Sequence, residues 1–196
     1  MTHDVFVLSD VGRVREHNED DSLVLPGYEV YVVADGMGGH ACGEVASRLS
    51  VEAIEEFYAD STLTKRLRNL YRTLKTEGDA GGARTFQEFR LRSAIEYGNR
   101  QIYMHACQDD RLADMGTTIV GVAFAGKRVY VAHVGDSRAY RYRDGATEQL
   151  TEDHSLANEF IRLNVLRRED LPRFPYKNVI VRALGLQEEV TVDTLY

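Results

Sequence analysis

Residues 33–40 read VADGMGGH and follow a largely apolar run that begins at Tyr28. Apolar residues that first alternate and then become continuous over 28–34 predict a strand entering a protein core. We therefore expect Asp35 where this strand ends and the chain turns. The glycines that follow can adopt positive φ angles, so backbone carbonyl oxygens can approach a ligand closely. Oxygen donors of this kind suit Mg²⁺ or Mn²⁺ rather than Zn²⁺, although an ordinary glycine-rich turn is equally compatible with this stretch alone.

A charged segment precedes this stretch. Residues 9–21 read SDVGRVREHNEDD and lie between two short β-type runs, at 5–8 and 22–25, so they predict a loop between strands. An arginine can bind phosphate through two parallel hydrogen bonds, and a carboxylate such as Asp20 can hold a metal-bound water. The two segments together would supply a phosphate-binding group and metal ligands. A solvated loop with local Arg–Glu pairs would have the same composition.

Four blocks of the chain resemble, in order, the motifs of the PPM or type 2C family of metal-dependent protein serine/threonine phosphatases, in its bacterial form. They are the residues 9–20, 34–40 (ADGMGGH), 115–118 (MGTT) and 134–140 (VGDSRAY). The resemblance extends over residues 5–196. It implies an enzyme that uses two Mn²⁺ or Mg²⁺ ions, with a third and weaker metal position. It also implies phosphoserine and phosphothreonine proteins as substrates and a cognate Ser/Thr kinase as a further partner.

The resemblance implies roles for individual residues. Arg15 matches the arginine that binds the substrate phosphate, whereas Arg13 is a neighbour without that role. His40 matches the histidine proposed to protonate the leaving alkoxide. We interpret Thr117 and Thr118 as packing residues near the site. The implied metal ligands are Asp20 with Glu19, the bridging Asp35, the backbone carbonyl of Gly36, and Asp136 at the third position.

These residue types fit the chemistry of two divalent ions. Ions about 4 Å apart can lower the pKa of a bridging water and hold a phosphoryl group for in-line attack, so no protein nucleophile is needed. Cys42 and Cys107 fit neither a cysteine-phosphatase loop nor a zinc motif, and we interpret them as small, buried, reduced residues. Of the other histidines, none has ligand spacing, and His133 lies in an apolar run that predicts a core position.

The fold implied by the resemblance is α+β. It is a four-layer αββα sandwich of two antiparallel β-sheets flanked by helices, here without its last strands. Residues 1–196 would form one phosphatase domain, with a flap subdomain at about 151–186. Family members continue through two aspartate ligands that have no counterpart in this chain, and Asp193 lies in the wrong context to replace them. We therefore expect the 196-residue chain alone to bind metal weakly and to have little activity.

The residue pattern itself predicts the elements. Two long amphipathic helices are expected at 44–58 and 86–108, with a flexible loop at 76–84 between them. A helix at 156–166 and a last strand at 190–196 follow later in the chain. Between the helices at 86–108 and 156–166 we expect a meander, with strands at 117–124, 128–133, 138–143 and near residue 148. Its turns are expected at 125–126 and 144–145.

Composition limits the class of protein. The chain has 196 residues, of which 43% are hydrophobic and 28% charged, so it is long enough for one domain with a core. No apolar segment reaches the length of a membrane span, and the first β-type run begins too early for a signal peptide, so we expect a cytoplasmic protein. The net charge of −7 argues against nucleic acid or an anionic membrane as a partner.

Three interpretations compete at this point. We favour the N-terminal part of a longer active phosphatase, because every catalytic residue expected in this region is present. The second is a non-catalytic regulatory or binding module that keeps the phosphatase fold and binds phosphorylated partners through Arg15. The third is a different metal-binding or hydrolase domain that shares only the Asp-Gly turn, and it leaves the four ordered blocks unexplained.

Overall fold

A computed structural model describes residues 4–38, 42–78, 80 and 82–196 of the chain. Its centre is an antiparallel sheet in which neighbouring strands follow the order β1, β2, β4, β5 and β8, with the short β3 paired to β2. The strands of this sheet are β1 Asp20–Leu25, β2 Val30–Met37, β3 Gly116–Thr117, β4 Ile119–Ala125, β5 Arg128–Val134 and β8 Asp193–Leu195.

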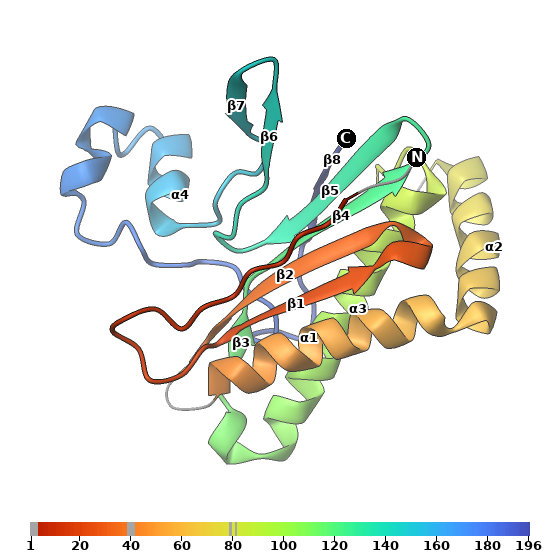
Figure 1. The fold of residues 1–196 in the computed structure, drawn as a ribbon, viewed down its shortest axis with the longest axis horizontal. Coiled ribbons are helices and arrows are strands. Elements are labelled where there is room, and N and C mark those ends of the chain that lie inside the picture. The colour runs from red at the N-terminus through yellow and green to blue at the C-terminus, as the bar shows by residue number, and fades with distance from the viewer. Residues whose placement is uncertain (1–3, 39–41, 79, 81) are drawn as a thin grey trace.

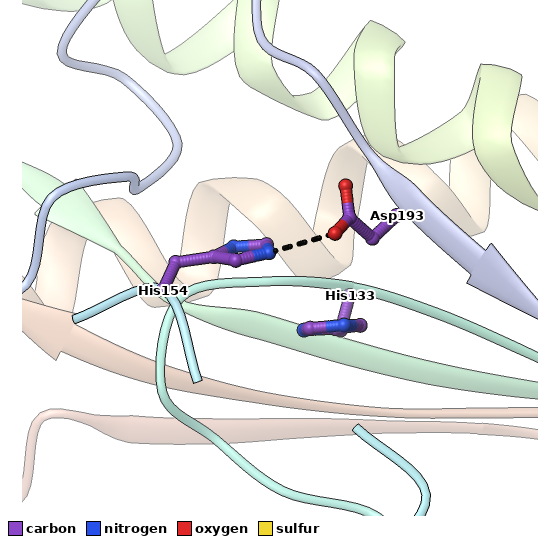
Figure 2. A group of neighbouring side chains, drawn as sticks. All are labelled: His133, His154 and Asp193. Atoms are coloured by element: carbon purple, nitrogen blue, oxygen red, sulfur yellow. Dashed lines mark hydrogen bonds and ion pairs between the residues drawn. The ribbon is translucent and has the colours of Figure 1, made fainter. Parts of the chain in front are cut away.

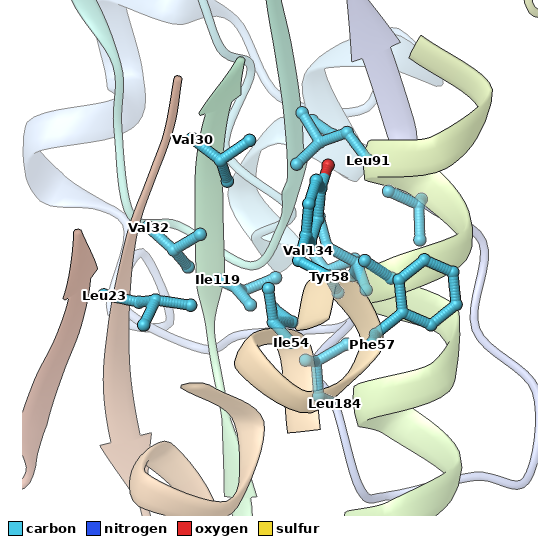
Figure 3. Packing of buried hydrophobic residues seen from close by; sticks show 14 of the residues in the cluster. Leu23, Val30, Val32, Ile54, Phe57, Tyr58, Leu91, Ile119, Val134 and Leu184 are labelled. Carbon is cyan, nitrogen blue, oxygen red and sulfur yellow. The ribbon is translucent and has the colours of Figure 1, made fainter. Parts of the chain in front are cut away.

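Two long helices, α1 Cys42–Ala59 and α3 Phe86–Gln108, pack against one face of this sheet (Figure 1). Both were predicted from the apolar spacing. Figure 3 shows the contact: strand residues such as Leu23 and Val32 meet Ile54 and Phe57 of α1 in a continuous buried cluster. Burial of each such side chain contributes about 1.5–3 kcal/mol. None of the helices in the described ranges combines the length and apolarity needed to cross a membrane.

A further helix, α2 Ser61–Glu77, was not predicted. Most of its residues are polar or charged, and only Leu67 and Tyr71 are buried, so its apolar stripe is narrow. The Asp60 carboxylate caps its first turn by accepting hydrogen bonds from two backbone amides at 2.8 and 2.9 Å. The helix ends at Glu77, so the loop expected at 76–84 begins two residues later than predicted.

The prediction of a strand at residues 5–8 is wrong. Residues 4–19 contain no strand, and Phe6 and Leu8 are 94% and 95% exposed. A β-type run becomes a strand only beside a partner that completes its hydrogen bonds, and no described strand pairs with residues 5–8. The expected run at 22–25 lies in β1, which pairs with β2 along its whole length.

The expected meander divides into two sheets. Strands β4 and β5 form a hairpin of the main sheet, whereas β6 Tyr140–Arg143 and β7 Ala146–Gln149 form a separate two-stranded sheet (Figure 1). The turn at Asp144-Gly145 is confirmed, with φ angles of 53° and 80° that match a type I′ turn. The other turn lies at residues 126–127, one residue later than predicted.

The segment expected as a flap contains α4 Leu156–Arg162, which ends earlier than predicted, and a short 3₁₀ helix at Arg168–Arg173. Two further 3₁₀ turns lie at Pro26–Tyr28 and Asp110–Leu112. The last strand is confirmed, because β8 pairs with β5. The α+β class and the antiparallel pairing are therefore as expected. Of the four expected layers, the described residues contain one helical layer, the main sheet and the small β6–β7 sheet.

Candidate active site

Asp20 and Asp35 stand directly opposite each other on β1 and β2. Val32 and Ala34 are buried, so the alternation along β2 places Asp35 on the face away from α1 and α3. We expected Asp35 at the end of this strand, but it lies two residues before the end of β2. The strand continues to Met37 because its last two residues pair with β3.

The pKa of the Asp35 carboxyl is raised from 3.8 to about 6. Partial burial is the first cause, followed by the charge and hydrogen bond of Asp20 and the charge of Asp136, while Arg15 lowers it. Asp35 keeps solvent access, so the neighbouring carboxylates together act on it more strongly than burial does. A divalent cation would relieve this repulsion, and the donors are all oxygens, so the residues fit Mg²⁺ or Mn²⁺.

Asp136 reaches this site from the turn that follows β5. The turn begins at Gly135, whose φ is +106° and where an added Cβ would lie 2.6 Å from Thr118 Cβ. Thr118 joins the two aspartate segments: its N–H donates to Asp35 O at 2.9 Å, and its hydroxyl lies 2.5 Å from the Ser137 hydroxyl. Thr118 is thus buried near the site, as expected, and also connects β2 to the Asp136 turn.

Arg15 lies in the segment before β1 and is largely exposed, with Nη1 3.8 Å from Glu19 Oε2. The Glu19 carboxylate also lies against Gly43 in the first turn of α1, where the helix dipole favours a negative charge. It is not among the groups that shift the pKa of Asp35. The structure therefore brings Arg15, Asp20, Asp35 and Asp136 together and places Glu19 at the edge of this group.

Gly36 connects the site to the helical layer. Its N–H donates to Glu19 O at 2.9 Å, and an added Cβ would lie 2.1 Å from Gly43 O of α1. The metal-binding role of its carbonyl stays a prediction. His40 lies outside the described residues, so its role also stays a prediction.

The two cysteines differ from expectation in burial. Both are free, but Cys107 is exposed and Cys42, at the start of α1, is partly exposed. Burial was expected from the usual behaviour of reduced cysteine. The last turn of α3 places the side chain of Cys107 toward solvent instead.

A second group of ionisable residues lies beside the site and consists of His133, His154 and Asp193 (Figure 2). One potential ligand atom from each lies within 4.8 Å of the others, and no other set of three meets this criterion within the described part of the chain. The core position of His133 is confirmed. The grouping was missed because it depends on the pairing of β5 with β8, which sets His133 opposite Asp193.

Comparisons with known proteins agree with this geometry. The protein phosphatase 2C family profile matches residues 13–179. The serine/threonine phosphatase stp of Listeria welshimeri is 36% identical over 189 residues, which cover 95% of this chain and 68% of that protein. The crystal structure of the Mycobacterium tuberculosis serine/threonine phosphatase PstP/Ppp is 32% identical with a TM-score of 0.74, over 96% of this chain and 71% of that one.

A further structure is similar at 31% identity and a TM-score of 0.70, over 96% of this chain and 70% of that one. It is the catalytic domain of the serine/threonine protein phosphatase PstP in complex with two manganese ions. The profile match covers most of the chain, and the acidic group where β1 begins beside β2 suits divalent cations. The chain belongs to the protein phosphatase 2C family of metal-dependent serine/threonine phosphatases.

Proposed function

We propose that Asp20, Asp35 and Asp136 hold divalent cations in this chain and that Arg15 binds the phosphate group of a phosphoserine or phosphothreonine protein. The chain then hydrolyses the phosphate ester of that side chain. The observation that carries this proposal is the acidic group itself. Two carboxylates face each other across β1 and β2, a third approaches from the turn after β5, and the pKa of Asp35 rises to about 6. Such an arrangement is unfavourable without a cation and favourable with one.

Mg²⁺ or Mn²⁺, when bound, supplies Lewis-acid stabilisation of the phosphoryl oxygens and activates water at neutral pH. The chain's own residues provide the geometry. Asp20 and Asp35 are fixed by their strand register, and Asn18 supports Asp20 by accepting its backbone N–H at 3.1 Å. The sheet therefore sets the spacing of the two carboxylates before any cation is present.

Arg15 is suited to phosphate. Its side chain is 67% exposed, and its ion pair with Glu19 is long, at 3.8 Å. An exposed pair of this kind contributes about 0–1 kcal/mol, so a phosphate dianion can replace Glu19 at small cost. A guanidinium offers two parallel hydrogen bonds to such a group. Arg15 would thus bind and orient the substrate phosphate against the three aspartates.

The remaining site roles in this proposal come from the family resemblance. The Gly36 carbonyl and Glu19 would complete the oxygen ligands, and His40 would protonate the leaving serine or threonine oxygen. Position supports these roles: Gly36 follows Asp35 directly, Glu19 precedes Asp20, and His40 lies five positions after Asp35.

We further infer that residues 151–186 form a flap that selects the substrate protein within a single phosphatase domain. A hollow of about 630 Å³ lies between this segment and β7. Arg138 in its wall is already paired with Asp153. The remaining charged residues of the lining are Arg168, Lys177 and Glu152, so one positive charge is left in excess. Positive charge here would favour acidic residues near the phosphorylated side chain. The kinase that makes such substrates would be a functional partner, and the cytoplasmic location stays a prediction.

The test is Mn²⁺-dependent release of inorganic phosphate from a phosphothreonine peptide, for which we expect a low but metal-dependent turnover by the 196-residue chain alone. Release should require Mn²⁺ or Mg²⁺ and should stop when EDTA is added. Turnover that persists in metal-free buffer would rule out the proposed site. Tight binding of the phosphopeptide through Arg15 without phosphate release, in the presence of Mn²⁺, would instead support the regulatory or binding module.

A further inference from the structure

The hydrogen bonds of His154 fix the position of its ring proton. Nδ1 lies 3.0 Å from the backbone N of Gly135, and Nε2 lies 3.1 Å from Asp193 Oδ2 (Figure 2). A backbone N–H can only donate, so Nδ1 accepts and carries no hydrogen. Nε2 of the neutral ring therefore carries the hydrogen and donates it to the Asp193 carboxylate. Arg182 Nη1 also lies 3.1 Å from Nε2, but its two hydrogens have acceptors in Asp193 Oδ1 at 2.8 Å and Thr191 O at 3.2 Å.

This arrangement argues against a cation among His133, His154 and Asp193, although their spacing resembles that of metal ligands. A cation would need the lone pair of His154 Nε2, which would leave the ring with no hydrogen. A histidine that binds metal normally donates its other ring N–H instead. Positive charge is also present already, because Arg182 Nη1 lies 2.8 Å from Asp193 Oδ1.

The same hydrogen bonds hold Gly135 from both sides. His154 N–H donates to Gly135 O at 2.9 Å, and Gly135 N–H donates to His154 Nδ1 at 3.0 Å. Asp136 is the next residue along the chain. Gly135 has a positive φ and touches Thr118, so the turn that presents Asp136 has little room for a second conformation.

The His154 ring is itself fixed in place. It is 93% buried, stacks on the His133 ring at 4.6 Å between centroids, and is oriented by Asp193 at Nε2. Burial lowers the pKa of both rings, that of His133 to about 4. Both rings are therefore neutral near pH 7, where this single tautomer persists.

We infer that His154 is a positioning residue of the phosphatase: its Nδ1 holds the Gly135 amide so that Asp136 faces Asp35, and Asp193 fixes the tautomer that makes this possible. This inference rests on the metal-binding role proposed for Asp136. Three separate segments carry the residues that are linked in this way. β8 carries Asp193, the segment before α4 carries His154, and the turn after β5 carries Asp136.

Two amide substitutions separate the two ring nitrogens. In His154→Asn the side-chain oxygen can take the place of Nδ1 and accept from Gly135. In His154→Gln the amide nitrogen can take the place of Nε2 and donate to Asp193, but the acceptor for Gly135 is lost. We expect slow hydrogen exchange of the Gly135 amide in the wild type and in His154→Asn, and fast exchange in His154→Gln. Mn²⁺ affinity, measured by calorimetry on folded protein, should fall about 10-fold in His154→Gln and stay close to wild type in His154→Asn.

Asp136→Asn is measured in parallel to separate the two proposals. If it weakens Mn²⁺ binding while His154→Gln binds as the wild type does, the positioning role is overturned and the proposed function stands. If Asp136→Asn binds Mn²⁺ normally, both the role of Asp136 and the positioning role fall. Equal losses of melting temperature and Mn²⁺ affinity in the Asn and Gln variants would show a merely structural histidine, and would also overturn the inference.

Discussion

Two groups of ionisable side chains flank the Gly135-Asp136 turn, and they differ in how their charges are compensated. In the first, Asp20, Asp35 and Asp136 repel one another, and Arg15 is the cation that opposes them in the pKa of Asp35. In the second, Asp193 is paired with both Arg182 and His154.

This difference indicates that the first group binds a ligand and that the second group holds the backbone in place. A fold that can pair Asp193 twice could also have paired Asp35, so uncompensated charge on a structured strand indicates a place for a ligand. The compensated group, in contrast, has no charge left to attract one. It is suited to hold backbone in place, because each of its hydrogen bonds restricts a neighbour.

The largest expected effect comes from Asp35→Asn. Removing this carboxylate should lower phosphatase turnover about 100-fold or more, because bound metal supplies several kcal/mol of transition-state stabilisation. Asp21→Asn is the matched control, since Asp21 pairs with Ala34 on β2 and its Oδ1 accepts only a local amide at 2.7 Å. Steady-state kinetics with Mn²⁺ and a phosphothreonine peptide provide the measurement. Similar losses in both variants would contradict a specific role for Asp35.

A smaller effect is expected from Arg15→Ala. Loss of a charge-assisted contact to phosphate should raise KM about 10-fold with little change in kcat, which corresponds to about 1.4 kcal/mol. Arg13→Ala is the control, because the same exposed segment carries Arg13 at a neighbouring position. The comparison of KM values for the two variants decides the matter. Equal KM values for Arg13→Ala and Arg15→Ala would reduce Arg15 to a general contribution of positive charge.

Replacement of an aspartate by asparagine should change stability in opposite directions in the two groups. His154 and Arg182 lower the pKa of Asp193 even though burial acts in the other direction, so this carboxylate stabilises the fold above its unfolded pKa. Asp193→Asn should therefore destabilise the chain by about 1 kcal/mol, a small value because the side chain is partly exposed. Urea unfolding at pH 7 measures it. A more stable Asp193→Asn variant would contradict the description of this group as compensated.

For Asp35 the sign is reversed and depends on pH. Its pKa is raised to about 6, so between pH 3.8 and 6 the folded chain binds more protons than the unfolded chain. The free energy of unfolding should then fall as pH rises through this window. At pH 7 Asp35 is ionised and the whole loss of stability is present. In EDTA, Asp35→Asn should melt at a higher temperature than wild type at pH 7 and at the same temperature near pH 4. A lower melting temperature at pH 7 would show that Asp35 is not repelled in the metal-free chain.

The acidic site could be predicted from the sequence because it depends on local motifs. Asp20 and Asp35 each lie within a recognisable block, and their strands are neighbours along the chain. The helices at 42–59 and 86–108 could be predicted equally well, since apolar residues recur along them at helical spacing. Errors arose where local preference and tertiary context disagree. Residues 5–8 have strand preference but no partner strand, and α2 is a helix with few apolar residues.

The histidine group could not be predicted in this way. His154 and Asp193 lie 39 positions apart, and they meet only because β8 adds to the edge of β5. No local pattern specifies which strand a final segment will join. The tautomer of His154 depends in turn on the Gly135 amide, which is visible only in three dimensions.

The contact of Gly36 with α1 has a consequence for how much variation this region tolerates. The atom that a side chain at position 36 would meet is the Gly43 carbonyl oxygen, 2.1 Å away, which belongs to the helix backbone. A backbone atom cannot be moved by a change of rotamer, so the whole helix would have to shift and draw Ile54 and Phe57 out of the core. A random library at this position, selected only for folded protein, should therefore return glycine, although the residue lies beside the proposed metal site.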